Sequence, residues 1–209
     1  MTHVVITIAR QYGSGGKTIG EMLAKELDIP CYNREILRMA SEESGISEQL
    51  FGQIDEKLNV GILHKLVKKA YDGELIQPEE EGFVSQDNLF NYQAKIIKEL
   101  ARQESCVIIG RCADYVLRDN ENVARIFIHA DEEFCMARAL ERNSLSAKDM
   151  KKYIARTDKY RAVFYKYYTG NEWSDARNFD LCINSGRLGF ERSVEEIRSY
   201  LGIRFGKKF

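Results

Sequence analysis

The stretch that decides the fold of this 209-residue chain is IARQYGSGGKT, at residues 8–18. It overlaps the end of VVITIA, residues 4–9, a short β-branched run that predicts a strand buried on both faces. Beyond the loop, apolar residues recur at helical spacing, at Ile19, Met22, Leu23 and Leu27. A strand, a glycine-rich loop and an amphipathic helix in this order indicate a phosphate-binding loop.

The glycines explain why this loop suits a polyphosphate. Several backbone N–H groups must point at one volume, and side chains would block that approach. The positive end of the following helix adds to the attraction. Lys17 would reach the β- and γ-phosphates, and the Thr18 hydroxyl would be a ligand of Mg²⁺. We therefore predict a cofactor site at Gly13, Ser14, Gly15, Gly16, Lys17 and Thr18. A glycine turn with a solvated lysine is the alternative interpretation.

The rest of the chain alternates between short apolar runs and helical patterns. A second strand is predicted to end near Tyr32. Three further strands are predicted at residues 106–109, 124–128 and 181–184. Helices are predicted from about residue 34, around 89–100, from 131, over 147–168 and around 194–201, and helical spacing also occurs at Leu63, Leu66 and Val67. This order predicts a three-layer α/β fold, a parallel sheet of about five strands with helices on both faces.

Composition narrows the class of protein. The length suits one domain over residues 1–209. The 31 Lys and Arg against 32 Asp and Glu give a formal charge of −1, which argues against a nucleic-acid partner. We expect a cytoplasmic protein without a membrane partner, because the sequence has neither a long apolar run nor a visible secretory signal. The five cysteines form no CxxC pair, so we expect reduced thiols.

Three motifs together resemble those of a known family. One is the loop at residues 12–18, and another is VIIGR at residues 107–111, a strand that runs into a Gly-Arg pair. The third is RTDKYR at residues 156–161, with an Asp-x-x-Arg pattern. The chain is similar over nearly its whole length to the cytidylate kinase-like family of P-loop nucleoside monophosphate kinases. This resemblance implies a P-loop kinase domain with a helical acceptor-side insertion over residues 45–103 and a lid over residues 143–172.

The resemblance also implies a reaction and some of its residues. The reaction is phosphoryl transfer from Mg·ATP to a nucleoside monophosphate, with CMP, dCMP or a related pyrimidine nucleotide as the acceptor. Carried over by position, Arg111 and Arg161 would hold the acceptor phosphate or the transferring group. Asp158 would orient the acceptor base or Arg161. Lys17, Arg111 and Arg161 are therefore the predicted catalytic residues.

Further arginines have two interpretations each. Arg34 follows the second strand and could hold an acceptor phosphate bidentately, or it could pair with a nearby glutamate. Arg156, in the basic segment at residues 148–166, could contact the cofactor from the lid, whereas most such segments are solvated helix faces. Arg111 could instead cap a helix or pair with Asp114. Arg138 and Arg142 could join the lid or form surface ion pairs.

Departures from the family pattern keep other functions open. Gln11 stands at the first glycine position of the loop, and Ile109 and Cys112 flank the Gly-Arg pair where an Asp is common. A kinase for another small metabolite is therefore one alternative. A nucleotide-binding protein without turnover is another. Aromatic residues of the basic segment are expected to pack the lid against the core rather than to stack on bases, namely Tyr160, Phe164, Tyr165, Tyr167 and Tyr168.

Overall fold

The computed structural model describes residues 3–57 and 73–206, and the predicted helical spacing at Leu63, Leu66 and Val67 lies outside them. The described strands are β1 (Val5–Arg10), β2 (Cys31–Tyr32), β3 (Cys106–Ile109), β4 (Val123–His129) and β5 (Leu181–Asn184). The longer helices are α1 (Gly16–Leu27), α2 (Glu35–Ser44), α3 (Glu48–Lys57), α5 (Gln86–Gln103), α7 (Glu132–Arg142), α8 (Ala147–Thr169) and α10 (Phe190–Phe205). Short helical turns are α6 (Ala113–Val116), η1 (Ala176–Asn178) and α9 (Ser185–Leu188).

The strands form one parallel sheet in the order β2-β3-β1-β4-β5, which confirms the predicted fold class. β1 lies at the centre, with Val5 in register with Cys106 of β3 and with Val123 of β4. Because all strands run the same way, their carboxyl ends meet at one edge of the sheet. Ligands of open parallel sheets bind outside this edge.

Alternate residues of β1 pack on opposite faces of the sheet. Val5 and Ala9 belong to a core with α2, α5, α6 and the end of α8. Ile6 and Ile8 belong to a second core with α1 and α10. Both faces are therefore covered, which explains why the strand sequences are almost wholly apolar.

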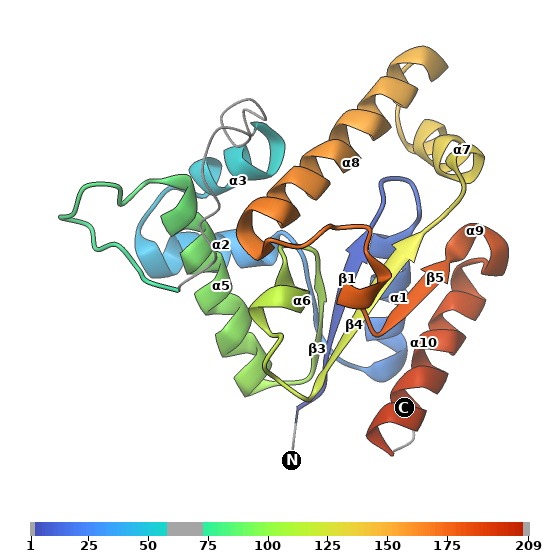
Figure 1. Ribbon diagram of the computed structural model, residues 1–209, viewed down its shortest axis with the longest axis horizontal. Helices are drawn as coiled ribbons and strands as arrows, with labels where there is room; N and C mark the ends of the chain where they lie inside the picture. Colours follow the sequence, from blue (N-terminus) through green and yellow to red (C-terminus); the bar gives the residue numbers. More distant parts are fainter. Residues whose placement is uncertain (1–2, 58–72, 207–209) are drawn as a thin grey trace.

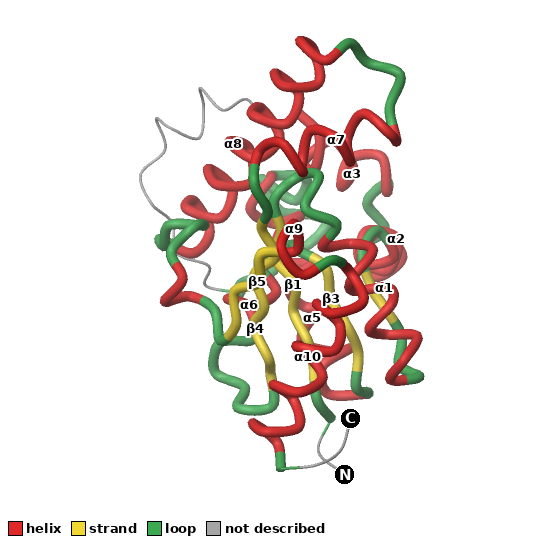
Figure 2. Tube along the Cα trace, turned by 90° about the vertical axis from the view of Figure 1, so that its right-hand side faces the viewer, coloured by secondary structure: helices red, strands yellow, loops and turns green. Residues whose placement is uncertain are grey.

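Helices α7 and α8 extend beyond the carboxyl edge of the sheet (Figures 1 and 2). Ser146 caps α8 by accepting a hydrogen bond from the Asp149 N–H, and Gly170 ends it in a left-handed conformation. The predicted range of 147–168 is thus correct within one residue. None of the described helices is apolar over a length that could cross a membrane.

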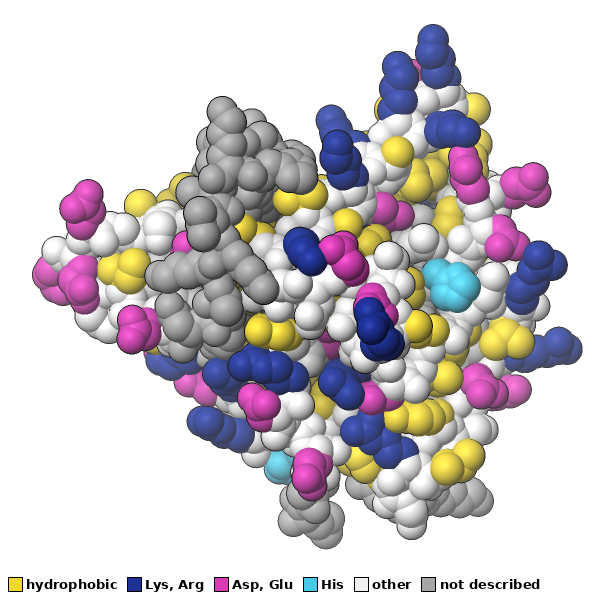
Figure 3. Space-filling view, viewed as in Figure 1, with side chains coloured by type: hydrophobic (Ala, Val, Ile, Leu, Met, Phe, Trp, Pro, Cys, Tyr) yellow, Lys and Arg dark blue, Asp and Glu magenta, His cyan; other side chains and the backbone are white. Residues whose placement is uncertain are grey.

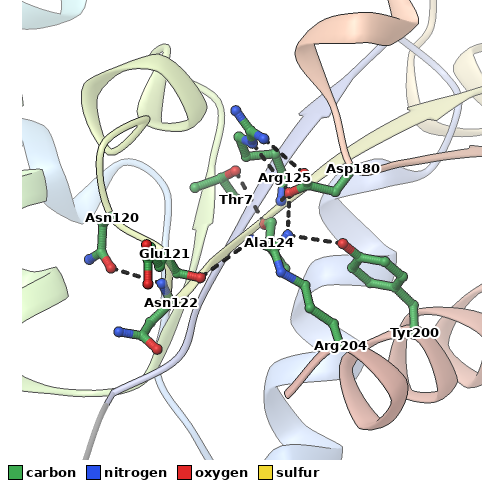
Figure 4. Close-up of polar contacts among 9 residues, drawn as sticks. All are labelled: Thr7, Asn120, Glu121, Asn122, Ala124, Arg125, Asp180, Tyr200 and Arg204. Atoms are coloured by element: carbon green, nitrogen blue, oxygen red, sulfur yellow. Dashed lines mark hydrogen bonds and ion pairs between the residues drawn. The ribbon is translucent and has the colours of Figure 1, made fainter. Parts of the chain in front are cut away.

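A polar network holds β4, β5 and α10 together (Figure 4). The Asp180 carboxylate accepts hydrogen bonds from the Arg125 Nη2 at 2.8 Å and the Arg125 backbone N–H at 2.8 Å. It also pairs with the Arg204 Nη1 at 2.6 Å, and Arg204 in turn donates to the Tyr200 hydroxyl. Burial opposes ionisation of Asp180, but the bonds from both arginines outweigh it and lower its pKa. The carboxylate therefore stabilises the fold at neutral pH.

Replacing Asp180 by Ala should lower the free energy of unfolding by about 2 kcal/mol, because two arginines then lose their shared carboxylate. The matched control is Asp119→Ala, since Asp119 is 88% exposed and pairs only loosely with Arg118 at 3.7 Å. The control should change stability by less than about 0.5 kcal/mol. Urea denaturation at pH 7 measures both variants, and equal losses would contradict the role of the network.

Candidate functional site

The glycine loop joins β1, the central strand, to the first turn of α1. Gly13 and Gly15 have φ angles of +83° and +79°, which L-residues with side chains rarely adopt. A β-carbon at Gly13 would also overlap the backbone carbonyl of Cys135, and one at Gly15 would overlap the ring of Phe190. The glycines are thus required twice, by the backbone conformation and by close packing against α7 and α10.

Side chains inside the loop attach it to β4. The Ser14 hydroxyl is fully buried and donates to the carbonyls of Gln11 at 2.9 Å and Ile128 at 3.2 Å. The Gln11 N–H donates to the Ile128 carbonyl, and its side-chain oxygen accepts from the Ala130 N–H at 3.2 Å. Gln11, at the first glycine position, therefore has a structural use that glycine lacks. The carbonyl of Ser14 accepts from the Ser185 hydroxyl at 2.6 Å, so Ser14 also ties the loop to α9.

The loop presents an uncapped helix N-terminus. No side chain of the described residues caps the first turn of α1, whose N-cap is Gly15. The first N–H groups of a helix have no partner within the helix, so they suit an anion. The exposed Lys17 ammonium lies 3.4 Å from Glu21, and the Thr18 hydroxyl accepts from Arg142 Nη2 at 3.1 Å. Because Mg²⁺ keeps several waters and takes few protein ligands besides phosphate oxygens, a single hydroxyl at Thr18 fits it.

A cavity of about 280 Å³ lies beside the loop at the carboxyl edge of the sheet. Three predicted acceptor-side arginines, Arg34, Arg111 and Arg161, line it from separate elements. Arg156 does not line the cavity; it lies on the exposed face of α8 with its guanidinium 5.7 Å from the centre of the Tyr153 ring. The other lining residues are Ala9, Arg10, Tyr12, Asn33, Ile109, Gly110, Cys112, Asp114, Tyr153, Thr157, Tyr160, Phe164, Tyr165 and Trp173.

Backbone strain places Arg111 in this cavity. Gly110, Arg111 and Cys112 all have positive φ angles, of +77°, +59° and +52°. A left-handed conformation costs a residue with a side chain about 1–2 kcal/mol, and such strain concentrates at functional sites. Arg111 Nε donates to the Asn33 carbonyl at 2.8 Å, and its Nη1 donates to the Gln93 side-chain oxygen at 2.9 Å. These bonds fix the guanidinium near the end of β2.

Arg161 is held by the loop and by its neighbour on α8. Its Nη1 donates to the Arg10 carbonyl and to Asp158 Oδ1, both at 3.0 Å. The same Asp158 oxygen accepts from the Tyr12 N–H at 2.8 Å. Burial raises the pKa of Asp158 and lowers that of Arg161, while their attraction opposes both shifts. Asp158 therefore orients Arg161, one of its two predicted roles.

The cavity also contains a buried carboxyl group, that of Asp114. The Tyr165 hydroxyl donates to Asp114 Oδ2 at 2.6 Å. Burial raises the pKa of Asp114 to about 6, against the hydrogen bond from Tyr165 and the charge of Arg125. Asp114 thus lies in the same cavity as Cys112, the position at which the family pattern has an acid. A shifted pKa inside a cavity is typical of functional sites.

The basic segment on α8 has two different faces. Lys and Arg side chains cover the projecting end of the molecule (Figure 3). The exposed basic residues of α8 are spread along the helix, as expected of a solvated face, namely Lys148, Lys151, Lys152, Arg156, Lys159 and Lys166. On the other face, Tyr168 stacks on Phe90 of α5 with ring centres 3.8 Å apart, and the Tyr167 hydroxyl donates to Asp87. Packing of α8 against the core is therefore confirmed for these two tyrosines. Tyr160, Phe164 and Tyr165 pack against the same core and also line the cavity.

The two arginines of α7 separate into the two predicted roles. Arg138 pairs with Glu141 and lies 5.0 Å from the centre of the Phe190 ring, so it takes part in surface contacts. Arg142 reaches across to the Thr18 hydroxyl at the glycine loop. Only Arg142 therefore joins the site.

Sequence reasoning missed two residues of the site. Arg10 ends the central strand and lines the cavity. Its place directly before the loop was a usable signal, because ligands bind outside the carboxyl ends of parallel strands. Gln93 lies on α5, is 1% exposed and holds Arg111. No local pattern distinguishes it from the other residues of that helix.

The parallel sheet and its glycine loop define the fold class as that of P-loop kinases. The chain belongs to the cytidylate kinase-like family, whose model matches residues 5–187. It is 24% identical over 206 residues, 98% of each chain, to a cytidylate kinase of Sulfurisphaera tokodaii. A solved structure of an uncharacterized protein from Eubacterium ventriosum has 25% identity and a TM-score of 0.70, covering 95% of this chain and 98% of that one. A shikimate kinase of Bacteroides thetaiotaomicron shares the fold with 17% identity and a TM-score of 0.51, over 95% and 98% of the two chains.

A first test concerns the glycine loop. Gly13→Ala should lower the free energy of unfolding by about 2–3 kcal/mol, from the left-handed conformation and the overlap with Cys135 together. Gly45→Ala is the matched control, because Gly45 has a φ of +73° but nothing within 4 Å of its β-carbon position. It should cost about 1 kcal/mol. Thermal or urea unfolding measures both, and equal costs would mean that the loop has room at Gly13.

A second test concerns the raised pKa of Asp114, which is about 6. Between the ordinary pKa and this value the folded state holds a proton that the unfolded state has lost, so stability falls as pH rises. Asp114→Asn should therefore be more stable than the wild type at pH 8, by about 1–2 kcal/mol. The gap should close as pH falls to 5. Asp119→Asn, at an exposed position, should show no such gap, and a gap that widens in acid would refute the shift.

Proposed function

We propose that the protein transfers the γ-phosphoryl group of Mg·ATP to a nucleoside monophosphate, with CMP and dCMP as the leading acceptors. The observation that carries the proposal is the cavity lined by Arg34, Arg111 and Arg161 directly beside the glycine loop. Phosphoryl transfer needs alignment of two phosphates and cations around the transferring group, rather than covalent work by the protein. A glycine loop and an arginine cavity side by side meet both needs.

Each end of the site has its own residues. The loop backbone at Gly13, Gly15 and Gly16 and the ammonium of Lys17 would bind the ATP phosphates. Thr18 would hold Mg²⁺, which neutralises phosphate charge when it is bound. Arg34 and Arg111 would hold the acceptor phosphate from the ends of β2 and β3.

The lid would complete the site from above. Arg161 faces the cavity and is oriented by Asp158, so it would contact the transferring group. Arg156 would contact ATP only after α8 moves, because in this structure it is exposed. The contact between Arg142 and Thr18 shows that the end of α7 can reach the loop. Closing such a lid excludes water from the reaction.

Support for a nucleotide acceptor comes from family membership and from the cavity itself. Asp114 is a hydrogen-bond acceptor within the cavity, and carboxylates accept from the exocyclic amine of cytosine. Aromatic side chains on α8, among them Tyr160 and Phe164, offer apolar surface for a base ring. A carboxylate-bearing hydroxyl metabolite would use the arginines but not these surfaces.

ADP release from Mg·ATP, measured with a panel of ribo- and deoxynucleoside monophosphates and hydroxy acids, tests the proposal. We expect a pyrimidine monophosphate to accelerate release, and Lys17→Ala to reduce that rate about 100-fold or more. Lys25→Ala, which removes an exposed lysine from the same helix, should leave the rate unchanged.

The outcomes separate the competing functions. Acceleration only by a hydroxy acid would replace the nucleotide acceptor by a small metabolite. ATP binding that depends on Lys17, without acceleration by any compound of the panel, would indicate a nucleotide-binding protein instead of a kinase.

A further inference from the structure

We propose that Arg10 is a phosphate-binding residue that reaches from the donor loop to the acceptor cavity and contacts the phosphoryl group in transfer. The inference rests on the proposed kinase function and assigns a role to a side chain outside the recognised motifs. It follows from where the two ends of this side chain lie.

The stem of Arg10 lies against the start of α1. A β-carbon on Gly16 would come within 2.5 Å of the Arg10 Cβ and 3.0 Å of its Cγ. Gly16 belongs to the loop whose N–H groups would bind the ATP phosphates. The first half of the Arg10 side chain is therefore packed beside the donor loop. It fills the space that a side chain on residue 16 would need.

The head of Arg10 lies at the acceptor edge. A β-carbon on Gly110 would overlap the Arg10 guanidinium, with its Cζ only 3.0 Å away. Gly110 begins the left-handed turn that carries Arg111 into the cavity. The guanidinium of Arg10 thus lies beside the backbone that positions an acceptor-side arginine, and it lines the same cavity. One side chain connects the two halves of the site.

The charges around Arg10 favour a ligand with more than one negative charge. Four arginines of the described chain line the cavity: Arg10, Arg34, Arg111 and Arg161. Two described carboxyl groups oppose these four charges: Asp114 lines the cavity with its pKa raised by burial, and Asp158 pairs with Arg161 at 3.0 Å. Like charges in one cavity repel each other, and a phosphate monoester beside a transferring phosphoryl group would offset that repulsion.

Arg10 differs from Arg161 in the element that carries it. Arg161 belongs to α8, which extends beyond the sheet, whereas Arg10 ends the central strand. Its stem is packed and its carbonyl accepts a hydrogen bond from Arg161. Arg10 therefore supplies a positive charge that does not depend on lid closure, and it also anchors the lid arginine through its backbone.

The positive charge of Arg10 would act on the phosphoryl group during its transfer. An oxygen of the acceptor phosphate forms a bond to the γ-phosphorus while the bond to the β,γ-bridging oxygen breaks. ADP leaves with the bonding electron pair, and a dianionic acceptor has no proton to lose. Charge is spread over the equatorial oxygens during transfer, between donor and acceptor. A guanidinium between the two halves of the site can bind those oxygens bidentately.

The test compares Arg10→Gln and Arg10→Lys with Arg38→Gln. Arg38 is an exposed arginine of α2 that pairs with Glu42 at 3.8 Å, so it is the matched control. We expect Arg10→Gln to lower kcat/KM for the acceptor about 100- to 1,000-fold while the Kd for Mg·ATP changes little. Arg10→Lys should recover part of the loss, because it keeps the charge without the planar fork. Arg38→Gln should match the wild type.

Three results would overturn the inference. An active wild type with unchanged kcat/KM in Arg10→Gln would show that Arg10 is not needed, while the kinase function would stand. A loss of Mg·ATP binding in Arg10→Gln as large as that in Lys17→Ala would mean that Arg10 only binds the donor nucleotide. A melting temperature of Arg10→Gln far below that of the wild type, with no recovery of activity in an equally destabilised Arg10→Lys, would reduce Arg10 to a structural residue.

A calorimetric titration with CMP keeps the test valid if the wild type phosphorylates nothing in the panel. Failure of the wild type to phosphorylate any compound of the panel would refute the proposed function but not, by itself, the role of Arg10. CMP binding by the wild type that Arg10→Gln loses would still support Arg10 as a phosphate-binding residue. Equal CMP binding by both proteins, or binding by neither, would overturn it.

Discussion

The close packing of the glycine loop is the constraint on which the rest of this structure depends. The loop lies against the Cys135 carbonyl of α7, the Phe190 ring of α10 and the Arg10 side chain of β1. Any β-carbon at Gly13, Gly15 or Gly16 would meet one of them. The N-terminus of α1 is therefore held open at the carboxyl edge of the sheet, where its N–H groups can bind an anion.

Positive charge is concentrated at the same edge by separate elements. Arg34 follows β2, Arg111 follows β3 in a strained left-handed turn, and Arg161 comes from α8. Each of the last two is held by identified partners, Gln93 and the Asn33 carbonyl for Arg111 and Asp158 for Arg161. Because such donors are already in position, they stabilise the charge that develops during a reaction and need not rearrange. The arrangement costs backbone strain at Arg111 and Cys112, whose φ angles are positive.

The elements were predictable where the pattern is local. Short β-branched runs identified the strands, and Ser146 with Gly170 marks the ends of α8 by ordinary capping chemistry. The lysine and glycines of the loop were also recognisable, because their chemistry lies within residues 13–18. By contrast, Arg10 and Gln93 carry no local signal as strong. Their importance comes from contacts outside their own segments: Arg10 lies beside Gly110, 100 positions further along the chain, and Gln93 binds Arg111, 18 positions further along and past the end of β3.

The sequence by itself determined the parallel α/β class, the glycine loop and the family, because burial on both faces and phosphate binding impose short, readable patterns. The tertiary structure alone decided which charged side chains share the cavity. It brought Arg111 in and left Arg156 on the solvated face of α8. It also placed Asp114, the acid nearest to the Gly-Arg pair in the sequence, in the wall of the cavity. The reason is that the direction of a side chain depends on backbone conformation and on its neighbours in space, and the left-handed turn at residues 110–112 becomes visible only once β3 is placed beside β1 and β2.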